Sequence, residues 1–205
     1  MKQLFLCSYF AGVKDLFRQY ASEKDLGKQV LFIPTAGNVE EYRGYIDEAL
    51  QTFADLGFQV EVLDISACDR ETAQAKIFQS KLLYVSGGNT FYLLQELKKK
   101  QLLSLIKEQI ADGMVYVGES AGAVITAEDV DYIRLMDDKA VAKELNDTVA
   151  LKEADFYVLP HVGEEPFLES SQATLDTYSD QLDLLPLNNH QAVLVEGEEV
   201  KVLEE

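Results

Sequence analysis

One serine of the chain, Ser120, has surroundings that suit nucleophilic chemistry. Gly118-Glu119-Ser120-Ala121-Gly122 has the pattern G-x-S-x-G and lies between an apolar run and an expected helix, which is the context that this pattern requires. The glycines allow a sharp turn that exposes the Ser120 hydroxyl at the end of a strand, and a following helix directs free backbone N–H groups to the same place. The pattern predicts that Ser120 is a nucleophile; an ordinary glycine-rich turn is the alternative.

A serine nucleophile needs a base, and the two histidines are His161 and His190. His161 follows the apolar run 156–159 and Pro160, so we expect it at the end of a strand, as we expect for Ser120. Ligands of open α/β sheets gather at the carboxyl ends of the strands, and His161 is therefore the predicted base. His190 lies in a polar stretch and is interpreted as a turn residue.

A second glycine-rich segment, Ser86-Gly87-Gly88-Asn89-Thr90, follows another apolar run. Two glycines allow the backbone to approach a ligand closely. We expect the Gly88 N–H to stabilise an oxyanion together with the Ala121 N–H. The same residues also fit a tight turn in which Thr90 is the N-cap of the next helix. The segment lacks the Lys-Ser/Thr pair of a P-loop, so phosphate binding is not expected.

The elements that must position these residues are apolar runs that alternate with amphipathic stretches. Buried strands are expected at 4–8, 29–33, 60–63, 82–85 and 114–117, and helices at 13–20, 42–56, 73–78, 91–97 and 102–110. This alternation is typical of a parallel sheet covered on both faces. No repeat, low-complexity tract or linker interrupts the chain, so one α/β domain is expected over residues 1–205.

The pattern is looser after residue 126. Residues 127–151 are rich in charge and are expected to form loop, hairpin or short helix. A further strand is expected at 156–159 and a helix at 167–182. A closing hairpin is expected around Glu196-Gly197-Glu198.

The composition is strongly acidic: 18 Lys and Arg oppose 36 Asp and Glu, which gives a net charge of −18. A chain with this charge repels phosphate backbones and anionic membrane surfaces, so neither nucleic acid nor a membrane is expected as a partner. No apolar run reaches the ~18–20 residues of a membrane span. The N-terminal apolar run is too short for a signal peptide, and a cytoplasmic protein is therefore expected.

The cysteines and histidines give no sign of a metal site. Cys7 and Cys68 form neither a disulfide framework nor a C-x-x-C pair. The two histidines are far apart in the chain and lack metal-ligand spacing. No metal or cofactor is expected, and the cysteines are interpreted as small apolar residues near strand ends.

Four segments follow one another in a recognisable order: Phe32-Ile33-Pro34-Thr35-Ala36-Gly37, Tyr84-Val85-Ser86-Gly87-Gly88-Asn89-Thr90-Phe91, Gly118-Glu119-Ser120-Ala121-Gly122-Ala123 and Pro160-His161. Together they resemble the aspartyl dipeptidase (peptidase E) and cyanophycinase family of serine peptidases, over about residues 30–197. The resemblance implies a three-layer α/β/α fold related to class I glutamine amidotransferases, with serine in place of their cysteine. It also implies peptide-bond hydrolysis with Ser120 as nucleophile, His161 as base, and oxyanion donors at Gly88 and Ala121.

The resemblance leaves the third member of the triad open. Similar proteins carry Glu or Asp in the stretch that corresponds to Leu187-Asn188-Asn189, where this chain has Asn189. An amide can orient an imidazole, but it cannot stabilise the imidazolium as a carboxylate does. Asp137 is the alternative third member, because some family members carry a functional Asp at the corresponding place; a solvated loop would also explain Asp137-Asp138.

The acidic charge is concentrated in the part of the chain that carries the predicted base. Residues 151–205 contain two lysines, thirteen acidic residues and no arginine. An enzyme that selects an acidic N-terminal residue needs a cationic partner, preferably arginine, so strict specificity for N-terminal aspartate is not expected. Glu164 or Glu165 is instead a candidate for binding the amino terminus or a basic side chain of a substrate, with a solvated acidic loop as the alternative.

The sequence therefore predicts a serine peptidase that hydrolyses short peptides, with a small peptide as its partner. One alternative is an esterase of the α/β-hydrolase type, although its order of Ser, acid and His fits poorly in the short connection from Ser120 to His161. The other is a binding or regulatory protein of the same fold that has lost its triad, which Asn189 favours. The oligomeric state, monomer or dimer, is left open.

Overall fold

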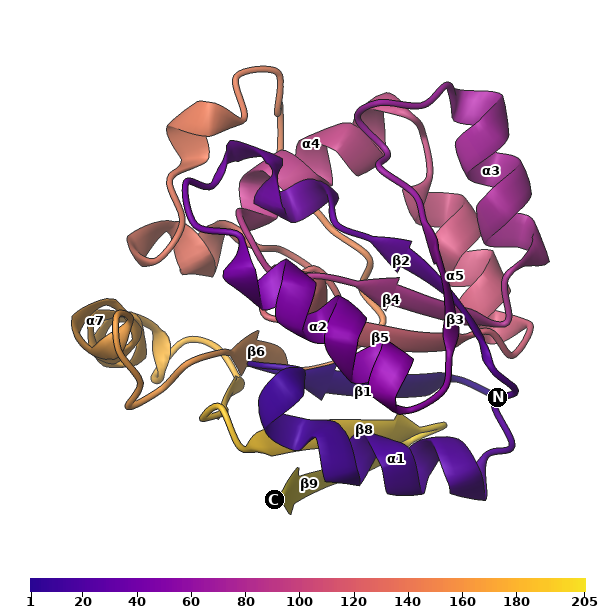
Figure 1. Cartoon of the computed structure of the whole chain (residues 1–205). Helices are drawn as coiled ribbons and strands as arrows, with labels where there is room; N and C mark the ends of the chain where they lie inside the picture. The colour runs from indigo at the N-terminus through magenta and orange to yellow at the C-terminus, as the bar shows by residue number, and fades with distance from the viewer.

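The computed structural model describes residues 1–205 and is built around a seven-stranded sheet (Figure 1). Its strands are β1 (Gln3–Cys7), β2 (Gln29–Ile33), β3 (Gln59–Val62), β4 (Leu82–Val85), β5 (Val115–Glu119), β8 (Gln191–Glu196) and β9 (Glu199–Glu204). The strand order is β3-β2-β4-β5-β1-β8-β9. The first five of these are parallel, and β8 and β9 are antiparallel additions. The loops that follow β1, β4 and β5 therefore meet at one edge of the sheet.

Helices cover both faces of this sheet (Figure 1). α1 (Lys14–Glu23) and α2 (Gly44–Asp55) pack on one face, and α3 (Arg70–Gln79), α4 (Thr90–Lys99) and α5 (Leu103–Ala111) pack on the other. Alternate residues of β1 point to the two sides: Leu4 and Leu6 belong to the larger apolar core, and Phe5 and Cys7 to the smaller one. All four side chains are fully buried, as expected for a strand covered on both faces. The predicted three-layer α/β/α sandwich with a mostly parallel sheet is confirmed.

The smaller core is a cluster of aromatic rings between the sheet, α1 and α2. Phe53 lies at its centre, with its ring centroid 4.6 Å from that of Phe10, 5.6 Å from Phe17 and 5.1 Å from Tyr84. Aromatic pairs of this kind contribute about 0.5–1.5 kcal/mol each beyond the area that they bury. The cluster therefore holds Tyr84 in a fixed position, and the hydroxyl of Tyr84 reaches the site described below.

The expected strands and helices of the first 126 residues are all present, with boundaries that differ by a few residues. Residues 127–151 form two short 3₁₀ helices, Asp131–Leu135 and Lys139–Val141, and a single antiparallel bridge between Asp129 and Val149. The predicted helix near residue 170 is α7 (Leu168–Tyr178), and the closing hairpin is β8–β9. No helix of the structure combines the length and the apolar character that crossing a bilayer would need.

The strand before His161 is present, but it does not extend the central sheet. β6 (Tyr157–Leu159) pairs in parallel with β7 (Leu184–Pro186) as a separate two-stranded sheet. The sequence did not predict β7, because three residues that end in a proline give no alternating pattern. His161 therefore approaches the site from a small sheet of its own, next to the edge where the parallel strands end.

Candidate active site

Ser120 occupies a strained turn between β5 and the short helix α6 (Ala121–Val124). Its backbone has φ 47° and ψ −108°, a region that residues with a side chain rarely adopt. The Ser120 N–H donates to the Cys7 carbonyl at 2.9 Å, and the Ser120 carbonyl accepts from the N–H groups of Ala123 and Val124. A side chain at Gly122 would overlap the Val85 carbonyl, so the turn can pack against β4 only with glycine there. The predicted strand–turn–helix geometry is confirmed.

His161 lies between Ser120 and Asn189. Its Nε2 atom is 2.9 Å from Ser120 Oγ, and its Nδ1 atom is 2.8 Å from Asn189 Oδ1. Because an amide oxygen only accepts hydrogen bonds, Nδ1 carries the proton and Nε2 is left free to accept from the serine hydroxyl. Burial lowers the pKa of His161, which favours this neutral form. The Phe167 ring stacks on the imidazole with centroids 4.6 Å apart and limits its rotation.

The backbone of His161 is held by Ser8, the residue that follows β1. His161 has φ 60°, and its N–H donates to Ser8 Oγ at 3.1 Å. The Ser8 hydroxyl in turn donates to the Leu187 carbonyl at 3.0 Å. Ser8 is fully buried, so this single hydroxyl joins the central sheet to the two-stranded sheet. The sequence did not single out Ser8; its one signal was a polar residue at the end of an expected buried strand.

Asn189 and Asp137 were both candidates for the third member of the predicted triad, beside Ser120 and His161. The structure places the two side chains differently. Asn189 contacts His161 as described, and its N–H donates to Glu164 Oε1 at 3.4 Å. The Asp137 carboxylate instead accepts from the Thr90 N–H at 2.7 Å, and no hydrogen bond joins it to His161. Burial raises the pKa of Asp137 to about 6. The side chain beside the imidazole is therefore the amide, and Asp137 lies elsewhere in the same pocket.

The loop after β4 carries the proposed oxyanion donor. Gly88 has φ 128°, and a side chain there would overlap the backbone of Ala36, so the close packing of the two loops requires glycine. The Gly88 N–H has no hydrogen-bond partner within the chain. The N-cap of α4 is Asn89 and not Thr90, because the Asn89 side chain accepts from the Tyr92 N–H at 3.0 Å. The prediction of Thr90 as N-cap was therefore wrong by one residue.

Glu119 is a buried carboxylate that the sequence pattern treated as a variable position. One of its oxygens accepts from the Phe10 N–H at 2.8 Å, and the other accepts from the Tyr84 hydroxyl at 2.6 Å and the Gly87 N–H at 3.3 Å. Burial raises the pKa of Glu119, although the three donors act to lower it. Glu119 thus ties the aromatic core to the loop of Gly87 and Gly88, the proposed oxyanion donor.

These residues border one pocket of about 760 Å³. Its lining includes Ser120, His161, Asn189, Gly88 and Asp137. Six carboxylates line it and no lysine or arginine does: Glu40, Glu48, Glu119, Asp137, Asp138 and Glu165. Of the two predicted substrate-binding acids, Glu165 is in the lining and Glu164 is not. No group of three or more His, Cys, Asp or Glu side chains in the chain is arranged to hold a metal ion.

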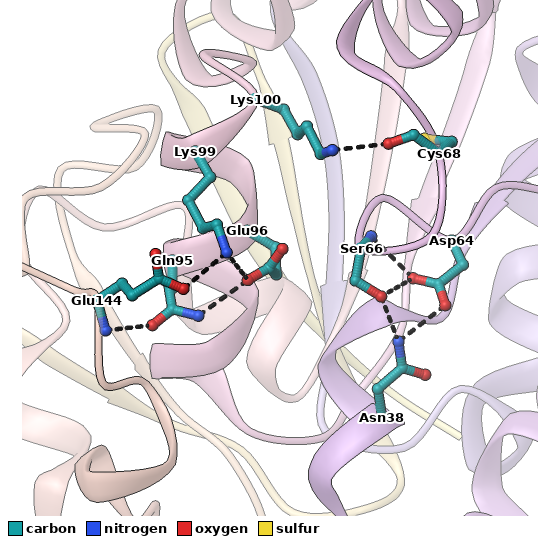
Figure 2. A network of polar contacts seen from close by, with 9 residues as sticks. All are labelled: Asn38, Asp64, Ser66, Cys68, Gln95, Glu96, Lys99, Lys100 and Glu144. Atoms are coloured by element: carbon teal, nitrogen blue, oxygen red, sulfur yellow. Dashed lines mark hydrogen bonds and ion pairs between the residues drawn. The ribbon is translucent and has the colours of Figure 1, made fainter.

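Polar networks hold the loops that form the pocket walls (Figure 2). Asp64 accepts from Asn38 Nδ2 at 2.9 Å and from the Ser66 hydroxyl at 2.8 Å, which fixes the segment before Glu40. Burial acts to raise the pKa of Asp64, but these hydrogen bonds outweigh it and lower the pKa. On the other wall, Gln95 of α4 accepts from the Glu144 N–H at 2.7 Å. Both walls are thus anchored by side chains outside the pocket.

The chain matches the model of peptidase family S51 over residues 6–203. An uncharacterized peptidase of Pasteurella multocida is 46% identical over 97% of this chain and 95% of its own length. A crystal structure of a Listeria monocytogenes protein, provisionally described as a peptidase E, is 42% identical, has a TM-score of 0.94 and covers 100% of this chain and 99% of that one. A peptidase E of Nostoc is 29% identical over 60% of this chain and 51% of its own length.

The fold, the match over nearly the whole length and these relatives define the protein as a peptidase. The chain belongs to peptidase family S51, and the resemblance drawn from its four sequence segments is confirmed.

Proposed function

We propose that this protein is a serine peptidase that hydrolyses short peptides, with Ser120 as nucleophile and His161 as base. The observation that carries the proposal is the chain of two contacts from Ser120 Oγ through the imidazole to Asn189 Oδ1, at 2.9 and 2.8 Å. A nucleophile within hydrogen-bond reach of a base, and a base oriented by a third group, is the arrangement that acyl transfer requires. Membership of a peptidase family supports the same reaction.

The proposed reaction follows from these positions. Ser120 Oγ attacks the carbonyl carbon of the peptide bond while its proton passes to His161 Nε2. The negative charge that develops on the carbonyl oxygen is stabilised by the N–H groups of Gly88 and Ala121. The tetrahedral intermediate then breaks its C–N bond, and His161 gives its proton to the leaving amine. Water, deprotonated by His161, attacks the resulting ester and releases the acid and free Ser120.

Asn189 orients the imidazole in this scheme but carries no charge. The imidazolium formed during the reaction is therefore stabilised less than it would be by a carboxylate. Glu164 supplies part of the missing charge, because its carboxylate accepts from the Asn189 N–H and its charge acts to raise the pKa of His161 against the lowering by burial. We expect a working but slow enzyme.

The pocket supports a short peptide as substrate and does not support strict specificity for N-terminal aspartate. A volume of about 760 Å³ is within the range of pockets that bind small molecules. Its lining holds six carboxylates and no lysine or arginine, so the carboxylate of an aspartate side chain would meet like charges.

The test is covalent labelling with a fluorophosphonate probe, followed by hydrolysis of a library of dipeptides and tripeptides. Wild type should be labelled and should release free amino acids. Ser120→Ala should lose labelling and at least about 10⁴-fold in rate, while the control Ser104→Ala, an exposed serine of α5, should retain both. Labelling with hydrolysis of acyl esters alone would favour the esterase, and a folded protein that is never labelled would favour a binding protein; either result contradicts the proposal.

A further inference from the structure

Two buried hydroxyl groups in the pocket have no hydrogen-bond partner. The chain has three buried side-chain polar atoms without a partner: Tyr20 Oη, Tyr45 Oη and Thr90 Oγ1. Tyr45 and Thr90 both line the pocket that contains Ser120, and Thr90 is only 1% exposed. Buried polar atoms are normally satisfied, and two of the three exceptions lying in one pocket point to a ligand that would bond to them.

Carboxylates surround these two hydroxyls. The Asp137 carboxylate accepts from the Thr90 N–H at 2.7 Å. Burial raises the pKa of Asp137 to about 6, and the Thr90 hydroxyl acts to lower it without reaching the geometry of a hydrogen bond. The charge of Glu40 also raises the pKa of Asp137. Burial is the main cause of the raised pKa of Tyr45, and the charge of Glu40 raises it further. Glu40, Tyr45, Thr90 and Asp137 all line this one pocket, and Thr90 and Asp137 are in direct contact.

No base of the chain neutralises these carboxylates. Neither Glu40 nor Asp137 forms an ion pair, whereas eleven ion pairs link acids and bases elsewhere on the molecule. The basic residue nearest to Tyr45 on this side of the pocket is Arg43. A Cβ atom added to Gly37 would lie 3.0 Å from Tyr45 Oη and 3.7 Å from Arg43 Nε, so both side chains border Gly37. Arg43 is exposed, forms no ion pair and is absent from the pocket lining. No positive group of the chain therefore lines the pocket, and a ligand can supply one.

We propose that Glu40, Tyr45, Thr90 and Asp137 form a subsite for a primary ammonium group of the substrate. An ammonium group has three N–H donors and no acceptor. The two carboxylates and the two free hydroxyl oxygens of the subsite provide acceptors for all three donors. Hydrogen bonds between charged partners are the strong ones, and an ammonium ion would also remove the repulsion between Glu40 and Asp137.

The subsite lies beside the nucleophile. A side chain on Gly87 would meet Ser120 Cβ at 3.3 Å and a carbon of the Tyr45 ring at 3.6 Å, so both residues border the same point. Thr90 begins α4 two residues after Gly88. The ammonium group therefore belongs to the residue that precedes the bond to be cleaved, as either its α-amino group or the end of a lysine side chain. This assignment of substrate class rests on the proposed peptidase function.

Binding to Ser120→Ala tests the subsite without requiring hydrolysis. Isothermal titration would compare alanyl-alanine with propionyl-alanine, in which hydrogen replaces the α-ammonium group. It would also compare lysyl-alanine with norleucyl-alanine, which lacks only the ε-ammonium group. We expect at least one pair to show about a tenfold or greater loss of affinity without the ammonium group, and the pair that shows it identifies the source. Equal affinities within both pairs would overturn the proposal.

Substitutions in the Ser120→Ala background locate the effect. Glu40→Gln, Asp137→Asn and Tyr45→Phe should each weaken binding of the ammonium ligand about tenfold and leave the affinity of its ammonium-free partner unchanged. Glu41→Gln changes an exposed neighbouring acid outside the pocket, and Tyr20→Phe removes the unpartnered hydroxyl that lies elsewhere; both should bind as the parent does. Unfolding temperatures would verify that each variant is folded. Selectivity that survives all three pocket substitutions would refute the assignment.

The two proposals fail in different ways. If wild type does not hydrolyse peptides but Ser120→Ala still selects ammonium ligands through Glu40 and Asp137, the subsite stands and the peptidase mechanism is wrong. If wild type hydrolyses peptides and propionyl-alanine binds as well as alanyl-alanine, with no preference for lysine, the mechanism stands and the subsite is wrong.

Discussion

The two sides of the site are built in different ways. Ser120 is fixed by main-chain contacts: its N–H bonds to β1, its carbonyl bonds to α6, and Gly122 packs directly on β4. His161 is fixed by side chains: the Ser8 hydroxyl holds its N–H, the Phe167 ring stacks on it, and the Asn189 amide sets its tautomer. The side of Ser120, the proposed nucleophile, should therefore fail by losing the fold. The side of His161, the proposed base, should fail by losing activity in a folded protein.

Gly122→Ala should have the largest effect, and on stability. The added methyl group would overlap the carbonyl of Val85, the last residue of β4. Val85 is paired with Ile33 of β2 and Gly118 of β5, so its backbone cannot move away without disturbing this pairing. We expect a loss of about 3 kcal/mol or more in the free energy of unfolding. Denaturant titration measures it. Gly113→Ala is the control, because nothing lies within 4 Å of the added methyl group there, although its φ of 103° adds some strain; equal losses in both variants would contradict a steric cause.

Asn189→Asp should raise the pKa of His161 and leave the fold intact. A carboxylate 2.8 Å from Nδ1 stabilises the imidazolium, and such a charge shifts a pKa by about one unit or more. In wild type, burial lowers the pKa of His161. The activity of wild type should therefore fall only at a pH below about 6.5, the ordinary pKa of histidine. The acid limb of the kcat profile should move to higher pH in the variant.

The neighbouring residue provides a control for that shift. Asn188→Asp adds the same charge, but the Asn188 side chain accepts from the His190 N–H and does not contact the imidazole. It should leave the acid limb where wild type has it. An unchanged limb in Asn189→Asp would mean that His161 does not act as the base.

Sequence patterns predicted the nucleophile side better than the base side. Apolar strands and the glycine pattern are local, so they predicted β5 and the turn in which Ser120 lies. The base side depends on contacts between distant segments: Ser8 is 153 residues from His161, and β7 is too short to give a pattern. Glu119 was missed for a related reason, because its three donors come from β4, the loop after β4 and the turn after β1. No spacing within the sequence encodes such contacts.

Ser8→Ala should reduce activity with a small loss of stability. The His161 N–H would lose its acceptor and the Leu187 carbonyl one of its two donors, because the Val162 N–H still donates to it; we expect a cost of about 1–2 kcal/mol in the free energy of unfolding. Because the imidazole would lose its fixed position relative to Ser120, we expect kcat to fall about tenfold. Steady-state kinetics and thermal unfolding measure the two effects. Ser22→Ala, at an exposed serine of α1, should change neither; a Ser8→Ala enzyme with wild-type kcat would contradict the side-chain tether.

Glu119→Gln should have the smallest effect, and it appears as a pH dependence of stability. Burial raises the pKa of Glu119 in the folded state, so the folded protein binds this proton more tightly than the unfolded chain. The proton on Glu119 therefore stabilises the folded protein. This contribution to the free energy of unfolding is fully present below the pKa of the unfolded chain and is lost as the pH rises through the pKa of the folded state. Glutamine cannot ionise, so the free energy of unfolding of the variant relative to wild type should rise as the pH increases from 4 to 7. Urea unfolding across this range measures the difference, with the exposed Glu108→Gln as control. A constant difference would mean that the three donors compensate the burial fully, and that the nucleophile side holds its carboxylate at no cost in stability.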